Sequence, residues 1–223
     1  MIILISLFTS CVTAQEISPP TDWALNDIKS PAKTAKYTLV SNPKTQLTYT
    51  INFNQNGFQN TLTSTLSDQY TTVALYMPYI NQRRTIATGI GEDQKTALKN
   101  IQDQSSQIST TPYTMPYEEW TTNNTLERHT LGQKTILTIN DQFQTVAINT
   151  TNNNKEVESS YNIIHLDSEK DLAGITLIPD TIYIITLERD HHKSWTKQKQ
   201  ILIPHEHPEQ QNITFTTRLI EYY

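Results

Sequence analysis

The sequence predicts a β-rich α+β protein, in which a small α+β lobe precedes an all-β sandwich. Threonine, isoleucine and tyrosine are abundant, and these residue types favour half-buried strands. Apolar and polar residues alternate in several segments, which is the pattern of a sheet with one wet face. A helical period is clear only over residues 92–104. We therefore expect the lobe over residues 35–108 and the sandwich over residues 128–223.

Residues 1–14 are predicted to be a signal peptide. The apolar run over residues 2–8 is shorter than the roughly 20 residues of a transmembrane helix. Small residues follow, and Ala14 fits an ordinary signal-peptidase site. The segment 8–11 also resembles the lipobox of bacterial lipoproteins, which implies that Cys11 becomes the lipid-modified first residue. Cleavage before Cys11 and cleavage after Ala14 both remain open, and the first would make Cys11 a lipid anchor.

Either cleavage predicts an exported protein that is periplasmic or secreted, and lipidation would make it an outer-membrane lipoprotein. Cys11 is the only cysteine, so the mature chain has no free thiol and no disulfide, which suits an oxidising compartment. No second apolar stretch reaches the length of a transmembrane span. The net charge of −5 and the pI of about 5.7 argue against a nucleic-acid partner.

Residues 15–34 are predicted to form a tether between the signal peptide and the first lobe. Pro19 and Pro20 make this segment stiff. Thr21 is placed to cap a short helix, and Pro31 is placed to end it.

Four strands are expected in the first lobe, at residues 37–41, 46–53, 70–76 and 84–90. In the second of these, every other residue from Leu47 to Phe53 is apolar or aromatic. The helix follows at residues 92–104, after Gly89 and Gly91. The acidic residues that open this helix would repel a pyrophosphate, so the two glycines do not predict a nucleotide site.

Residues 109–127 are predicted to be a linker, because prolines, aromatic residues and asparagines replace the strand pattern. The segment 128–223 is predicted to be all-β, with turns every 8–12 residues as in sandwiches. Its strands are expected at residues 134–140, 143–150, 161–166, 175–177, 181–189, 200–204 and 212–222.

The segment 177–183 resembles the Leu-x-Pro-x-Thr-x-Tyr signature of fibronectin type III domains, through Leu177, Pro179, Thr181 and Tyr183. This resemblance covers residues 130–204 and implies an immunoglobulin-like or fibronectin-type sandwich. It also implies that Tyr183 begins a strand and that its hydroxyl bonds to the nearby backbone.

A basic segment with one tryptophan, the 189–199 loop, is the first candidate site. It is predicted to connect two strands, and loops on a rigid scaffold commonly carry recognition. Cationic side chains beside tryptophan suit another protein, an anionic surface or an anionic glycan. The predicted binding residues are Arg189, His192, Lys193, Trp195, Lys197 and Lys199. The first functional hypothesis is therefore a non-enzymatic binding or assembly protein, which needs no cofactor.

His205 and His207 are the second candidate site. Histidines two apart on a strand point to the same side and can share a metal ion. The alternative hypothesis is therefore a secreted hydrolase or metal-dependent enzyme that uses this region. No serine elbow motif supports it, and no cysteine nucleophile survives export.

Overall fold

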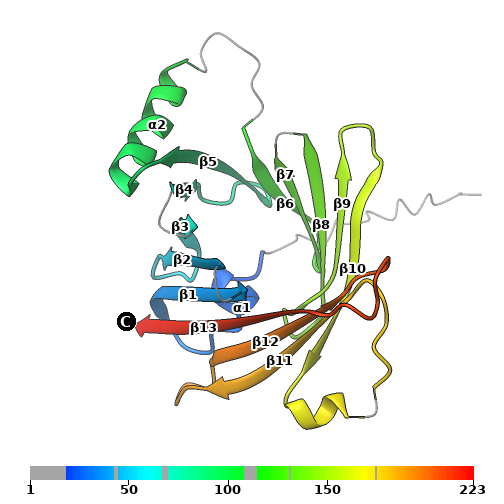
Figure 1. The fold of residues 1–223 in the computed structure, drawn as a ribbon. Coiled ribbons are helices and arrows are strands. Elements are labelled where there is room, and N and C mark those ends of the chain that lie inside the picture. Colours follow the sequence, from blue (N-terminus) through cyan, green and yellow to red (C-terminus); the bar gives the residue numbers. More distant parts are fainter. Residues whose placement is uncertain (1–18, 43–44, 67–69, 108–114, 131, 174) are drawn as a thin grey trace, which may run out of the picture.

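The computed structural model describes residues 19–223 except 43–44, 67–69, 108–114, 131 and 174. Within this part of the chain, thirteen strands pair edge to edge in one closed barrel, in the order β1-β13-β12-β11-β10-β9-β8-β7-β6-β5-β4-β3-β2. Neighbouring strands are antiparallel except β10 and β11, which are parallel. Figure 1 shows β1–β5 and β6–β10 facing one another, with β11–β13 joining them.

The strands have the following bounds: β1 (Ala32–Asn42), β2 (Thr45–Phe53), β3 (Gln59–Leu66), β4 (Tyr70–Tyr76), β5 (Arg83–Gly91), β6 (Tyr117–Thr122), β7 (Thr125–Thr130), β8 (Gln133–Ile139), β9 (Thr145–Asn152), β10 (Val157–Leu166), β11 (Thr181–Arg189), β12 (Trp195–Ile203) and β13 (Asn212–Tyr222). The helices of the described residues are α1 (Asp22–Leu25), α2 (Gln94–Gln107) and the short 3₁₀ helix η2 (Glu169–Leu172).

The predicted division into an α+β lobe and an immunoglobulin-like sandwich is wrong, because strands from both halves share one barrel. β1 pairs with β13, where Tyr37 lies opposite Arg218. β5 pairs with β6, where Arg84 lies opposite Glu118. Alternation predicts which face of a strand is buried, but it does not predict which strand edges meet.

Most predicted strands occur close to their expected positions. The exceptions are β3, which was not expected, and β6 and β7, which arise largely from the segment 109–127 that the sequence predicts as a linker. Residues 175–177 form no strand. The predicted helix at 92–104 corresponds to α2.

The fibronectin resemblance is wrong about the fold, because the chain forms a barrel and not a sandwich. The hydrogen bonding of the tyrosine hydroxyl that the resemblance implies is nevertheless present. The Tyr183 hydroxyl accepts from the backbone N–H of Ile178 (3.1 Å) and donates to the carbonyl of Thr176 (3.5 Å). These bonds lie in the crossover between the parallel strands β10 and β11. Tyr183 and Ile185 are buried with Ile201 and Ile203 in one apolar cluster, to which Leu172 of η2 also contributes. In this protein the 177–183 motif therefore anchors the β10–β11 crossover to β11. In a fibronectin-type sandwich the same motif would anchor a corner between strands.

Helix α2 packs on the outer face of β4 and β5. Val73 and Ala87 form one apolar cluster with Ala97 and Ile101 of the helix. A side chain at Gly89 would place Cβ only 2.2 Å from the carbonyl oxygen of Ala97, so glycine is required for close helix packing. Within the described residues, no helix is long and apolar enough to cross a membrane.

The N-terminal segment (residues 19–31) runs against the opposite, inner face of the barrel strands. Trp23 of α1 donates its backbone N–H to Gly57 (3.2 Å) and its indole N–H to Ala32 (2.9 Å). Ile28 belongs to the same buried cluster as Tyr37 of β1 and Trp195 of β12. The described part of the segment predicted as a tether is thus packed into the barrel.

Candidate functional site

A buried ionic network joins the N-terminal segment to the barrel strands. Arg84 donates two hydrogen bonds to Asp22, from Nη1 to Oδ2 (2.7 Å) and from Nη2 to Oδ1 (3.0 Å). Its Nε donates to Glu118 Oε1 (2.6 Å). Arg128 donates to the second oxygen of Glu118 from Nε (3.2 Å) and Nη2 (3.1 Å). Two carboxylates and two guanidinium groups therefore balance one another, and all of them are buried except Arg128, whose side chain is 42% exposed.

Burial and pairing act in opposite directions on the ionisation of this network. Burial raises the pKa of Glu118, but the guanidinium groups of Arg128 and Arg84 outweigh it and hold that pKa below its ordinary value. Burial lowers the pKa of Arg84, whereas Glu118 and Asp22 outweigh it and raise that pKa. Glu118 and Arg84 therefore stay charged. The network anchors α1, because breaking one buried pair would leave an unpaired charge in the interior.

A second anchor holds the end of the N-terminal segment. Arg218 of β13 is buried, and its guanidinium carbon lies 3.9 Å from the centre of the Trp195 ring. It donates to the carbonyl of Trp195 from Nε (2.9 Å), to the carbonyl of Asp27 from Nη2 (3.3 Å) and to the carbonyl of Asn26 from Nη1. The Tyr37 hydroxyl donates to the Asn26 side-chain oxygen (3.0 Å). The positions of Asn26 and Asp27 are therefore fixed by the barrel.

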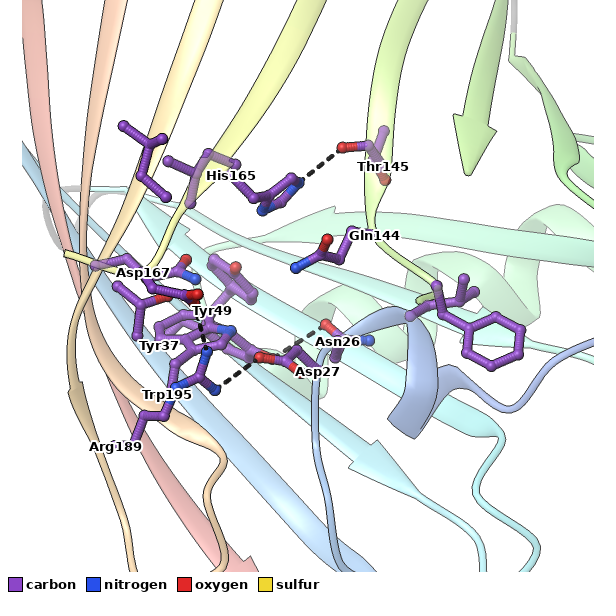
Figure 2. A pocket seen from close by; sticks show the side chains of 16 residues that line it. Asn26, Asp27, Tyr37, Tyr49, Gln144, Thr145, His165, Asp167, Arg189 and Trp195 are labelled. Atoms are coloured by element: carbon purple, nitrogen blue, oxygen red, sulfur yellow. Dashed lines mark hydrogen bonds and ion pairs between the residues drawn. The ribbon is translucent and has the colours of Figure 1, made fainter. Parts of the chain in front are cut away.

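A cavity of about 200 Å³ lies between this segment and the strands β1, β2 and β9–β12 (Figure 2). Tyr37 and Tyr49 line it as a stacked pair, with ring centres 4.3 Å apart and planes 10° apart. Trp195 also lines the cavity and packs edge-on to Tyr37 at 5.8 Å. Burial raises the pKa of Tyr49, so its phenol stays neutral. This side of the cavity is aromatic and uncharged.

Side-chain amides and an imidazole also line the cavity. Asn26, Gln144 and Gln198 each carry one amide donor and one amide acceptor group. His165 Nε2 lies 2.8 Å from the carbonyl oxygen of Thr145 and must carry a proton to donate to it. In neutral His165, Nδ1 is therefore left as an acceptor. Figure 2 shows Gln144 and His165 across the cavity from the aromatic rings.

The charged groups of the cavity are paired at its rim. Arg189 Nη1 lies 3.2 Å from Asp27 Oδ2, and its Nη2 lies 4.0 Å from Asp167 Oδ1. Lys29 forms a further ion pair with Asp27. Because these positive and negative side chains neutralise one another, the cavity has little net charge with which to attract an ion. It therefore favours an uncharged polar group.

The predicted 189–199 loop is shorter in the structure, because β11 ends at Arg189 and β12 begins at Trp195, which leaves residues 190–194 as the turn. The side chains of the predicted loop are split between the cavity and the surface, and Arg189 and Trp195 line the cavity. His192 packs on Tyr222, with ring centres 4.1 Å apart, and its Nδ1 lies 2.9 Å from Ser30 Oγ. These contacts join the loop to the N-terminal segment.

Of the three lysines in the segment 189–199, Lys193 is in the turn, whereas Lys197 and Lys199 are half-buried residues of β12. Lys193 is exposed and has a positive φ of 65° at the tip of the hairpin. Lys197 pairs with Glu188 (3.2 Å) and Lys199 pairs with Glu169 (3.0 Å). Recognition of a protein or an anionic surface by these residues stays a prediction.

His205 and His207 lie in the exposed segment after β12. Their Nδ1 atoms contact different acids, Asp180 at 3.4 Å and Glu209 at 3.5 Å respectively. In the described part of the chain, no group of three or more His, Cys, Asp or Glu side chains is placed to hold a metal ion. Metal binding and the enzyme alternative stay predictions, and Cys11 lies outside the described residues.

Sequence reasoning missed the residues that shape the interior. One signal in the sequence could have found them: a charged residue at a strand position where the alternation predicts an inward-facing apolar residue. Arg84 shares a face with Ile86 in β5, and Arg218 shares a face with Ile220 in β13. An arginine at such a position predicts a buried partner.

Comparison of the chain with protein-family models, curated proteins and solved structures finds no match.

Proposed function

We propose that this chain is an exported binding protein that holds a small organic ligand inside its barrel. The observation that carries the proposal is the cavity of about 200 Å³ beside the N-terminal segment. Aromatic rings and amide groups both line it, and ligand sites typically combine an apolar surface with a few placed polar groups. Export is supported by the apolar start of the sequence and by a single cysteine within that start.

The lining favours an uncharged polar ligand. The stacked pair of Tyr37 and Tyr49 offers a flat apolar surface, and the amides of Gln144 and Gln198 offer both donors and acceptors. Arg189 and Asp27 already neutralise one another. A charged ligand would have to break such a pair, whereas a hydroxyl or amide group would not.

The cavity size limits what it can hold. Sites for drug-sized ligands typically measure about 300–1,000 Å³. A cavity of about 200 Å³ therefore suits a compact molecule or one end of a longer molecule.

Filling the cavity tests the proposal. Thr186 lines it, and its neighbour across the strands is Gln198. We expect Thr186→Phe to occupy the space while the protein remains folded. Thr217→Phe is the matched control, because Thr217 is exposed on β13.

The measurement is ligand-observed NMR with methyl glucoside, glycerol, N-methylacetamide and phenol as probes. We expect at least one probe to bind the wild type and Thr217→Phe but not Thr186→Phe. Binding that Thr186→Phe leaves unchanged, or no binding of any probe to the wild type, would overturn the proposal. Thermal unfolding of each variant checks that loss of binding does not reflect loss of the fold.

A further inference from the structure

Apolar side chains on the inner face of β3, β4 and β5 are exposed. Gly89 faces α2 on the outside, so its neighbour Ile90 points to the inner face. Ile90 lies opposite Thr72 of β4, and Tyr70 is on the same face two residues earlier. Leu66 of β3 lies directly opposite Tyr70. The exposed fractions are 53% for Leu66, 65% for Tyr70 and 61% for Ile90.

Leu66 and Tyr70 extend a row of apolar side chains that crosses the four strands β1–β4. Leu39 of β1 lies opposite Leu47 of β2, which lies opposite Leu66, which lies opposite Tyr70. Adjacent strands are about 4.8 Å apart, so the row is about 14 Å long. Leu39 and Leu47 are half-buried at one end of the row, and Leu66 and Tyr70 are exposed at the other.

The row begins beside the cavity. Tyr37 and Tyr49, which line the cavity, are opposite one another and share the inner face with Leu39 and Leu47. Each tyrosine is two residues from its leucine along the strand, which is a distance of about 7 Å. The aromatic side of the cavity thus continues directly into the apolar row.

We propose that the ligand is a single-chain amphiphile, whose uncharged polar head occupies the cavity and whose aliphatic chain lies along Leu39, Leu47 and Leu66. The inference rests on the proposed function and specifies its ligand. The cavity alone is too small for a drug-sized ligand, and the row supplies a second, apolar subsite next to it. A single aliphatic chain is narrow enough to lie on the inner face of the barrel, whereas a folded protein would clash with the strands on the other side of the barrel.

Alkyl glucosides, kept below their micelle-forming concentrations, test the length of the apolar subsite. The series is methyl, hexyl, octyl and decyl glucoside, and the measurement is isothermal titration calorimetry with the full chain. Each methylene that leaves water strengthens binding by up to about fourfold. We expect the affinity to rise at each step of the series, and we expect decyl sulfate and decyltrimethylammonium to bind more weakly than decyl glucoside.

Leu66→Asn tests where the chain lies. Its side chain is exposed, so this variant should fold. Leu219→Asn is the control, because Leu219 is 74% exposed and alternates with the inward-facing Arg218 on β13. We expect Leu66→Asn to reduce the gain in affinity from octyl to decyl glucoside at least threefold, and we expect Leu219→Asn to leave that gain unchanged.

The outcomes separate this inference from the proposed function. If all glucosides bind equally, or if chain length matters equally in Leu66→Asn, the apolar row is not the chain site. In that case methyl glucoside binding that Thr186→Phe abolishes would still support the cavity. A concentration-dependent dimer that Leu66→Asn abolishes would show that a second copy covers the row, and would overturn the inference.

Discussion

Asp22 and Arg84 form a bidentate ion pair inside the barrel, with oxygen–nitrogen distances of 2.7 and 3.0 Å. Asp22 comes from the four-residue helix α1, and Arg84 comes from β5. The same Asp22 carboxylate accepts the backbone N–H of Gln59 at 2.6 Å. One acidic side chain thereby ties the N-terminal segment to two strands that are adjacent neither in sequence nor in the sheet.

We expect Asp22→Asn to destabilise the protein by about 3–5 kcal/mol, because it leaves part of the Arg84 charge buried without its partner. Equilibrium unfolding in urea measures the change. Glu221→Gln is the control, since Glu221 pairs with Lys33 on the surface, and such pairs contribute about 0–1 kcal/mol. Equal losses in the two variants would show that the buried pair has no special role.

The buried Glu118 predicts how stability changes at acid pH. Pairing with Arg128 and Arg84 outweighs burial and lowers the pKa of Glu118 in the folded state. Its unfolded pKa is about 4.3. The stabilising contribution is therefore complete above that pH and is lost as the pH falls through the folded pKa.

Glu118→Gln tests whether the contribution of Glu118 to stability is lost, and not gained, as the pH falls. We expect the difference in unfolding free energy between the wild type and Glu118→Gln to be constant at neutral pH and to shrink below pH of about 4. Thermal melts over a pH series measure it. A difference that grows as the pH falls would contradict the assignment.

The sequence predicted single elements much better than their assembly. Alternation located β2 and β11, and a helical period located α2, because both patterns depend on neighbouring residues. Closure of the barrel depends on the pairing of β1 with β13, which lie at opposite ends of the chain. No local pattern encodes that pairing, so a sandwich and a barrel give the same strand pattern.

The missed strand β6 has a clear physical reason. Its inner face carries Glu118, which is fully buried and paired with two arginines. A charge at an inward position breaks the apolar alternation that identifies strands. The cavity shows the same limit, because Arg189 and Trp195 line it together with Tyr49 only through the pairing of strands that are far apart in the sequence.

Two glycines with the same backbone conformation test how α1 is held. Gly57 has φ of 84° and Gly132 has φ of 85°. A Cβ at Gly57 would lie 2.6 Å from the Trp23 ring, whereas the nearest atom to a Cβ at Gly132 is 3.9 Å away. Both alanine variants incur the left-handed strain of about 1–2 kcal/mol. We expect Gly57→Ala to lose clearly more unfolding free energy than Gly132→Ala and to change the tryptophan fluorescence. Similar losses in the two variants would show that the Trp23 ring moves away from the new side chain at no cost.

Two buried threonines give opposite predictions for substitution by valine. Thr216 is 3% exposed, and its hydroxyl has no hydrogen-bond partner among the described residues. Thr181 is 1% exposed, and its hydroxyl donates to the carbonyl of Pro179 at 3.3 Å. An unpaired buried hydroxyl costs about 1–3 kcal/mol, whereas a satisfied one contributes about 1 kcal/mol.

We therefore expect Thr216→Val to raise the unfolding free energy by about 1 kcal/mol and Thr181→Val to lower it by a similar amount. Valine keeps nearly the same volume, so neither variant opens a cavity, and the sign of each change reports on the hydroxyl. Urea unfolding of both variants measures the difference. Destabilisation by Thr216→Val would mean that its hydroxyl has a partner in solution. Because Thr216 lies opposite Gln198, which lines the cavity, the next step would then be to repeat the measurement with methyl glucoside.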